Sequence, residues 1–93
     1  MRIILIYDIA TENAEDQNRL NIVRKIARKY LHHVQKSVFE GNITPARLER
    51  LKGELKRILD KDRDSVIIYI FGDAVDVKRE LLTNIDDPTD TFI

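Results

Sequence analysis

The sequence predicts a single-domain α+β fold, and three observations support this prediction. Two apolar, β-branched runs bracket residues 1–72, two amphipathic segments lie between them, and an extended hairpin region separates those segments. This order matches the ferredoxin-like β-α-β-β-α-β topology, in which both helices cover one face of an antiparallel sheet. Ninety-three residues suffice for one such core, so we expect one domain over 1–93, with its core at 1–72 and a tail at 73–93.

The first strand is predicted over residues 2–8, an almost wholly apolar run that ends at Asp8. An ionised carboxylate at the margin of a buried strand is costly unless a cation or hydrogen bonds compensate it. Asp8 is therefore either a cap for the next turn or helix, or a metal ligand or base. The residue pattern alone leaves both interpretations open.

The first helix is predicted over about 16–31. Asn13, with Asp16 three positions on, is typical of a helix start. An apolar stripe then recurs at helical spacing, at Leu20, Val23, Ala27 and Tyr30. Residues 32–41 are rich in Val and Phe without a helical stripe, so we expect them to be extended.

The second helix is predicted over about 45–60, because Thr44-Pro45 is a favourable N-cap and first turn and an apolar stripe follows. A charged turn at 60–64 leads to a second apolar strand at 65–71, which ends before Gly72. Residues 75–82 are compatible with either a short helix or a continued edge. The apolar end of the acidic tail, residues 91–93, is expected to dock on another surface.

Each of the two predicted strands carries apolar side chains on both of its faces. In the first strand, for example, Ile3 and Leu5 point to one face and Ile4 and Ile6 to the other. An antiparallel sheet with one face in water should alternate apolar with polar residues instead. Something must cover the second face, and a second copy of the same sheet is the simplest candidate. We therefore expect a homodimer packed through its sheets.

Formal net charge is zero, but charge is unevenly distributed along the chain. Residues 17–59 hold eleven Lys or Arg against three acids, a surplus of eight, whereas residues 73–93 hold six acids against two basic residues. Basic helices are suited to contact the phosphates of nucleic acid, although ordinary solvated helix faces are the alternative. The candidate nucleic-acid-binding residues are Arg19, Arg24, Arg28, Arg47 and Arg50.

The composition also excludes several classes of site. The absence of cysteine excludes disulfides, zinc–thiolate centres and thiol nucleophiles. The apolar N-terminal run is too short to span a bilayer and lacks a cleavage site, so we expect a cytoplasmic protein with no membrane partner. His32 and His33, consecutive in an extended segment, point to opposite faces and cannot jointly hold one ion.

The segment Val34-Gln35-Lys36-Ser37-Val38-Phe39-Glu40-Gly41 is the most specific in the chain. Together with Tyr7-Asp8-Ile9, with Arg19, and with the run from Asp64 to Tyr69, it resembles the small CRISPR-associated endonuclease family of the spacer-adaptation module, the companion of the CRISPR integrase. The resemblance covers about residues 1–72, and residues 90–93 are similar to the family's closing strand. Many members have a glycine where this chain has Leu31, so the exit of the first helix is expected to differ.

The resemblance implies a ferredoxin-like homodimer with face-to-face sheets, two short strands within 32–41, and a C-terminal extra strand that extends the partner's sheet. The family's metal-binding acid matches Asp8, and Arg19, Ser37 and Phe39 match other positions near the catalytic site. Two facing copies of Asp8 could share one Mg²⁺ or another divalent cation, which prefers oxygen ligands and activates water. Arg19 would then offset phosphate charge and Ser37 would position a water or ligand.

Two functions from different classes follow. In the first, the dimer is a metal-dependent phosphodiesterase that cuts RNA or double-stranded DNA at Asp8. In the second, it is a structural adaptor that bridges the CRISPR integrase and holds the prespacer duplex on its basic helices, without need of Asp8. We expect spacer acquisition to be the biological role, with the acidic tail docking on the integrase.

Overall fold

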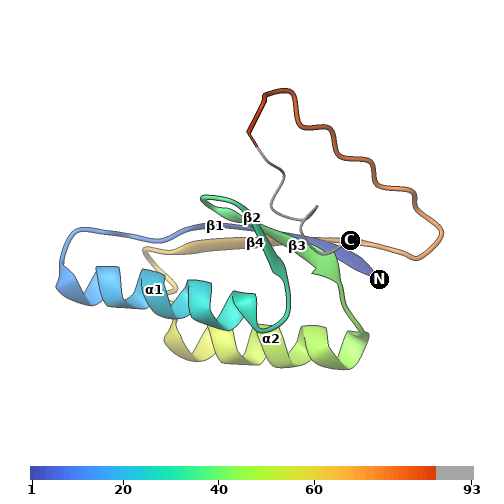
Figure 1. Cartoon of the computed structure of the whole chain (residues 1–93). Helices are drawn as coiled ribbons and strands as arrows, with labels where there is room; N and C mark the ends of the chain where they lie inside the picture. The colour runs from blue at the N-terminus through green and yellow to red at the C-terminus, as the bar shows by residue number, and fades with distance from the viewer. Residues whose placement is uncertain (86–93) are drawn as a thin grey trace.

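The sheet and both helices are formed within residues 1–85, which are the residues that this computed structural model describes. The elements in chain order are β1 (Arg2–Asp8), α1 (Ala14–Arg28), β2 (His32–Gln35), β3 (Val38–Asn42), α2 (Pro45–Ile58) and β4 (Ser65–Phe71). The antiparallel sheet has the order β2-β3-β1-β4, and both helices lie on one side of it (Figure 1). The predicted α+β, ferredoxin-like fold is confirmed, including the two short strands within 32–41. The expected closing strand at 90–93 lies outside the described residues.

The pairing of β1 with β4 fixes which side chains share a face. The register runs from Arg2 opposite Phe71 to Asp8 opposite Ser65, so Ile6 stands opposite Ile67. Because side chains alternate between faces along each strand, Asp8 lies on the same face as Ile6. The register thus places an acid at one end of an apolar face.

Local capping sets the ends of the helices. Asn13 accepts a hydrogen bond from the Asp16 amide (2.9 Å), so α1 starts two residues earlier than predicted. The helix ends three residues earlier than predicted, and the Leu31 amide donates to the Ala27 carbonyl (2.9 Å). No described residue has a positive φ, so this exit needs no glycine in a left-handed conformation.

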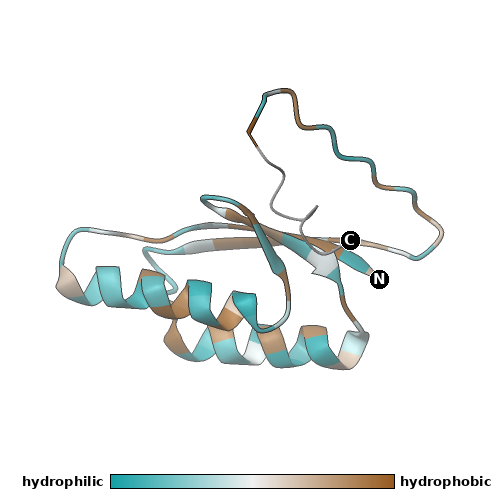
Figure 2. Ribbon diagram, in the orientation of Figure 1, coloured by the Kyte–Doolittle hydropathy of each residue, from teal (hydrophilic) through white to brown (hydrophobic). Residues whose placement is uncertain are grey.

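The helix-facing side of the sheet forms the core. Ile3, Leu5 and Tyr7 of β1 are buried there, packed with the apolar stripes of both helices. Figure 2 shows apolar segments along the strands and alternating polar and apolar segments along both helices. The stripes predicted from the sequence therefore do bury their apolar side chains under the sheet.

Among the described residues, the other face of the sheet is open along β1 and β4. Ile6, Ile67 and Tyr69 are 38, 48 and 50% exposed. Residues 75–82 form neither the short helix nor the continued edge that the sequence allowed. That segment instead reaches back through Arg79, whose Nε lies 2.8 Å from the carboxylate of Glu40.

Candidate active site and basic helix surface

Asp8 stands at the end of β1 with its side chain exposed on the open face. Within residues 1–85, its carboxylate accepts no hydrogen bond and makes no ion pair. The role of helix cap belongs to Asn13, so that alternative for Asp8 does not hold. Asp8 is therefore a carboxylate whose ligand-binding capacity the described fold leaves unused.

The turn that carries Ser37 is held beside the end of β1. The Tyr7 amide donates to the Ser37 carbonyl (3.1 Å), and the Tyr7 hydroxyl donates to the Lys36 carbonyl (2.6 Å). Arg24 in turn donates from Nε to the Tyr7 hydroxyl (3.1 Å). The structure thus brings Ser37, which is exposed, next to the residue that precedes Asp8.

Phe39 is not part of an accessible site, so its position does not support the predicted role in catalysis. Its side chain is fully buried, stacked on the His33 ring (centroids 4.3 Å apart) and close to Tyr7 (5.9 Å). A ring with no exposed surface cannot contact a substrate. Phe39 packs behind the strand that ends at Asp8.

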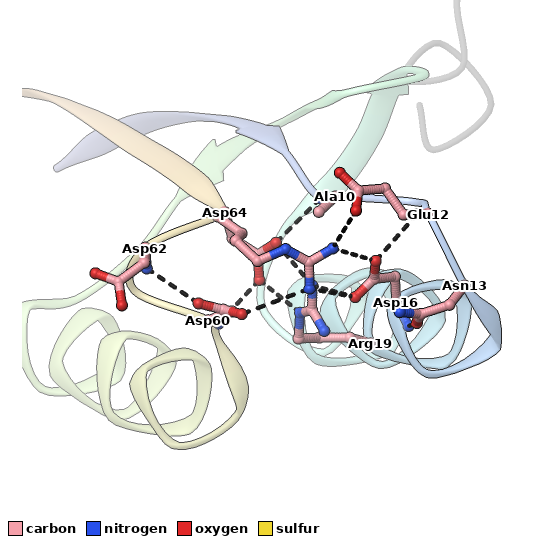
Figure 3. Close-up of polar contacts among 9 residues, drawn as sticks. Ala10, Glu12, Asn13, Asp16, Arg19, Asp60, Asp62 and Asp64 are labelled. Carbon is pink, nitrogen blue, oxygen red and sulfur yellow. Dashed lines mark hydrogen bonds and ion pairs between the residues drawn. The ribbon is translucent and has the colours of Figure 1, made fainter.

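Arg19 has a structural role in place of the predicted contact with phosphate. Its side chain is 14% exposed, its Nε donates to Asp64 (2.5 Å), and it also forms an ion pair with Asp16 (3.0 Å). Figure 3 shows these groups where the start of α1 meets the turn before β4. Because both carboxylates are already bound to it, the guanidinium of Arg19 is committed to the fold.

Asp64 is the centre of this buried cluster. Its side chain, 1% exposed, also accepts from the amides of Ala10 (3.0 Å) and Asp60 (2.9 Å). Asp16 binds the guanidinium of Arg63 through both oxygens (3.0 and 2.5 Å). Ala10 follows Asp8 by two residues, so the cluster fixes the path of the chain as it leaves β1.

The arginines hold the pKa values of both acids below their usual range. For Asp64 the largest cause is its hydrogen bond with Arg19, and for Asp16 it is the hydrogen bond with Arg63. Sequence reasoning missed this cluster, although the alternation of acid and base in the turn at 60–64 was a signal for it. Both acids are ionised at neutral pH and serve the fold.

The other four candidate nucleic-acid-binding arginines differ in how far the fold engages them. Arg24 is half-buried and bonded to Tyr7. Arg28 and Arg47 are exposed, but Arg28 lies 3.5 Å from the His33 ring and Arg47 donates to the Lys29 carbonyl (3.2 Å). Arg50 is exposed and has no hydrogen bond or ion pair in the part of the chain that the structure describes.

The donor groups of one chain fit a divalent cation only in part. Across residues 1–85, no group of three or more His, Asp or Glu side chains is arranged to hold a metal ion. Magnesium is commonly held by one or two carboxylates and otherwise by water and substrate phosphates. Asp8 can supply one such carboxylate.

Within residues 1–85, no helix is both long and apolar enough to cross a membrane.

Comparisons with known proteins agree with this fold. The family model for CRISPR associated protein Cas2 matches residues 1–79. A CRISPR-associated endoribonuclease Cas2 of Moorella thermoacetica is 51% identical over 90 residues, covering 97% of this chain and 99% of that protein. One from Thermococcus kodakarensis is 46% identical over the full length of both chains. The crystal structure of Streptococcus pyogenes Cas2 at pH 6.5 superposes with a TM-score of 0.71 at 34% identity, covering 85% of this chain and 100% of that one.

Proposed function

Because the chain belongs to the Cas2 family of CRISPR-associated proteins, we propose that it is an endonuclease of spacer acquisition whose reactive carboxylate is Asp8. The main support for this role is that Asp8 is exposed and unpaired among the described residues, whereas the acids near it in the fold are bonded to arginines. The Moorella and Thermococcus relatives are both named endoribonucleases. RNA is accordingly the first substrate to test, and double-stranded DNA the second.

The proposed functional unit is a homodimer that packs through the open face of the sheet. Ile6, Ile67 and Tyr69 leave apolar area on that face that a second copy would remove from water. A two-fold axis through this face would bring the same surface of each copy together. Asp8, at the end of the same face, would then meet its counterpart in the partner.

The chemistry follows from the groups this chain offers. Two Asp8 carboxylates could hold one Mg²⁺ or a similar divalent cation, which when bound would polarise a phosphodiester and lower the pKa of a water ligand. The exposed hydroxyl of Ser37 lies on the turn beside β1 and could orient that water or a phosphate oxygen. The buried Arg19–Asp64 pair would position the chain after Asp8 without touching substrate.

A second candidate function is that of an adaptor for the CRISPR integrase and the prespacer duplex. The observation that favours it is the exposed basic surface of the helices. Both helices lie on one side of the sheet (Figure 1), and the register of β1 assigns the side chain of Asp8 to the other face. This role uses the dimer as a spacer and its arginines as phosphate contacts, and it does not require a carboxylate. Both functions can reside in one molecule.

One pair of assays tests the two functions together. Asp8→Asn removes the charge of the carboxylate at nearly constant size, so metal-dependent cleavage of RNA or DNA should fall by at least about 100-fold. Spacer integration by the same variant should stay near that of the wild type. Cleavage that Asp8→Asn leaves unchanged would refute the nuclease role, and loss of integration by a folded, dimeric variant would refute an adaptor role that is independent of Asp8.

The dimer requires its own experiment. Ile67→Lys places a charge in the centre of the open face and should weaken self-association by at least about tenfold, as measured by analytical ultracentrifugation. Ile22→Lys is the matched control, because Ile22 is exposed to a similar degree but lies on α1. Equal association of the two variants would contradict a dimer formed through the sheets.

A further inference from the structure

We propose that the outer surface of α2 carries a phosphate-binding notch, formed by Tyr30, Arg50, Gly53 and Arg57, which holds the backbone of a nucleic acid at a distance from Asp8. This inference rests on the proposed function, because it assigns residues to the surface that would carry the duplex. The notch is a shallow hollow of about 470 Å³, which Glu49 and Glu54 also line.

Arg50 and Arg57 supply the charge of the notch. They are seven positions apart in α2, so they stand on one side of the helix, two turns or about 10 Å from each other. Both are exposed, and in residues 1–85 neither makes a hydrogen bond or an ion pair. Unlike Arg19, these guanidinium groups keep all their donors for a ligand.

The two acids of the hollow have partners of their own. Glu54 accepts the Tyr30 hydroxyl (2.6 Å) and pairs with the ammonium of Lys29, and Glu49 pairs with Lys52 (3.2 Å). The Lys29 hydrogen bond is also the main reason why the pKa of Glu54 lies below its usual range. Arg57 also lowers that pKa through its charge, but Lys29 and Lys52 already balance the two acids, so Arg50 and Arg57 are left as surplus positive charge.

Tyr30 lines the notch, and Arg47 lies over the ring of Tyr30. The guanidinium of Arg47 lies 4.8 Å from the centre of the Tyr30 ring, and its donation to the Lys29 carbonyl holds it there. A third positive group thus stands next to the hollow in a fixed position. The site is assembled from both helices, since Tyr30 follows α1 and the arginines belong to α2.

Gly53 supports the phosphate-binding notch independently of the arginines. A glycine inside a helix costs about 1 kcal/mol relative to alanine. A Cβ at this position would meet no atom within 4 Å, so packing within the described chain gives no reason for the glycine. By contrast, a Cβ at Gly41 would lie 3.4 Å from Leu31. Bare backbone between two unpaired arginines permits close approach by an external group.

The chemistry of the notch favours phosphate. Guanidinium groups bind phosphate oxygens in pairs of parallel hydrogen bonds, and a run of phosphates supplies repeated acceptors for two arginines on one helix face. The helices cover the face of the sheet opposite to Asp8 (Figure 1), so a strand in the notch is not presented to Asp8 of the same chain. The notch would hold nucleic acid without cutting it.

Binding of a fluorescent DNA duplex of random sequence, measured by anisotropy over a range of salt concentrations, tests the notch. Arg50→Ala/Arg57→Ala should weaken binding by about tenfold and reduce the salt slope by about two. Lys61→Ala/Lys78→Ala, which removes two exposed basic side chains outside the helices, is the matched control and should keep the wild-type slope.

Gly53→Ala separates a binding role from a structural one. The added methyl group should raise the thermal stability of the chain, because alanine is the better helix former, and should still weaken duplex binding. Gly72→Ala is the control, since its Cβ also meets nothing within 4 Å and it lies outside the notch. A Gly53→Ala chain that binds as well as the wild type would remove the glycine from the site.

The possible results distinguish a failure of the adaptor function from a failure of the notch. A wild-type protein that binds no duplex would overturn both the adaptor function and the notch. If the wild type binds but Arg50→Ala/Arg57→Ala keeps its affinity and slope, the notch is wrong and the adaptor function stands. If that variant keeps its duplex binding and loses the integrase, the arginines bind an acidic protein surface, and the phosphate assignment is overturned.

Discussion

Asp8 and Asp64 sit at the same end of two paired strands, yet they differ in almost every physical respect. Asp8 ends β1 and is exposed without a partner among the described residues, whereas Asp64 precedes β4 and is bonded to Arg19, Ala10 and Asp60. Asp64 directly precedes Ser65, the residue that pairs with Asp8 on the neighbouring strand. A position at a strand end therefore does not decide the role of an acid, because the neighbouring donors do.

This contrast explains how a small domain can leave one carboxylate free to bind a ligand. The buried acids are neutralised by two arginines, so their charges stabilise the junction of α1 with β4. The exposed acid keeps its lone pairs, and the chain on either side of it is fixed by the Tyr7 and Asp64 bonds. Fixed backbone around an unsatisfied group is the usual design of a binding site.

The largest effect on stability should come from Asp64. Asp64→Ala leaves Arg19 without one of its carboxylates in a mostly buried position, and we expect a loss of about 3 kcal/mol in the free energy of unfolding, measured with urea. Asp62→Ala is the matched control in the same turn, because Asp62 is exposed, and it should change stability by less than about 0.5 kcal/mol. Similar losses for both variants would mean that the cluster contributes no more than a surface acid.

A smaller effect should appear on acidification. The pKa values of Asp64, Asp16 and Glu54 are lowered in the folded chain, so the stability they provide is fully present above the unfolded pKa of about 4 and is lost as pH falls below it. Unfolding curves should be level from pH 8 to about 5 and then decline. Asp64→Asn should show a shallower decline in the free energy of unfolding below pH 5. A decline equal to that of the wild type would contradict the contribution assigned to Asp64.

The smallest effect should be that of Asp8→Asn on folding. An exposed acid without partners contributes little to stability, so we expect a change within about 0.5 kcal/mol, measured by the same urea titration. Combined with the expected loss of cleavage, this result would separate the reactive acid from the structural one. A large destabilisation would show that Asp8 has a structural partner in the folded protein.

The fold was largely predictable, since its elements follow from local patterns. The strands at 2–8 and 65–71 were predicted with the bounds that the structure has, because unbroken apolar β-branched runs have few alternatives. The end of α1 was predicted too late. Tyr30 and Leu31 continue the apolar period and remain in or beside the core, although the backbone has already left the helix.

The site was predictable only where it depends on neighbours in sequence. The place of Asp8, at the end of an apolar strand, could be predicted from the sequence, whereas its role as a metal ligand stays a prediction. The structural role of Arg19 could not be predicted, since Arg19 meets Asp64 across 45 positions. Side-chain partners at such separations are set by topology, which composition and periodicity do not encode.

The turn between β2 and β3 is bound to Tyr7 entirely through the main-chain oxygens of Lys36 and Ser37. Any amino acid that keeps the same backbone conformation can supply a carbonyl group, so the side chains of residues 36 and 37 are not needed to hold the turn against Tyr7. Evolution, or an engineer, can exchange them at little thermodynamic cost. A cassette of variants at positions 36 and 37 is therefore the natural library for altering substrate preference next to Asp8 on an unchanged scaffold.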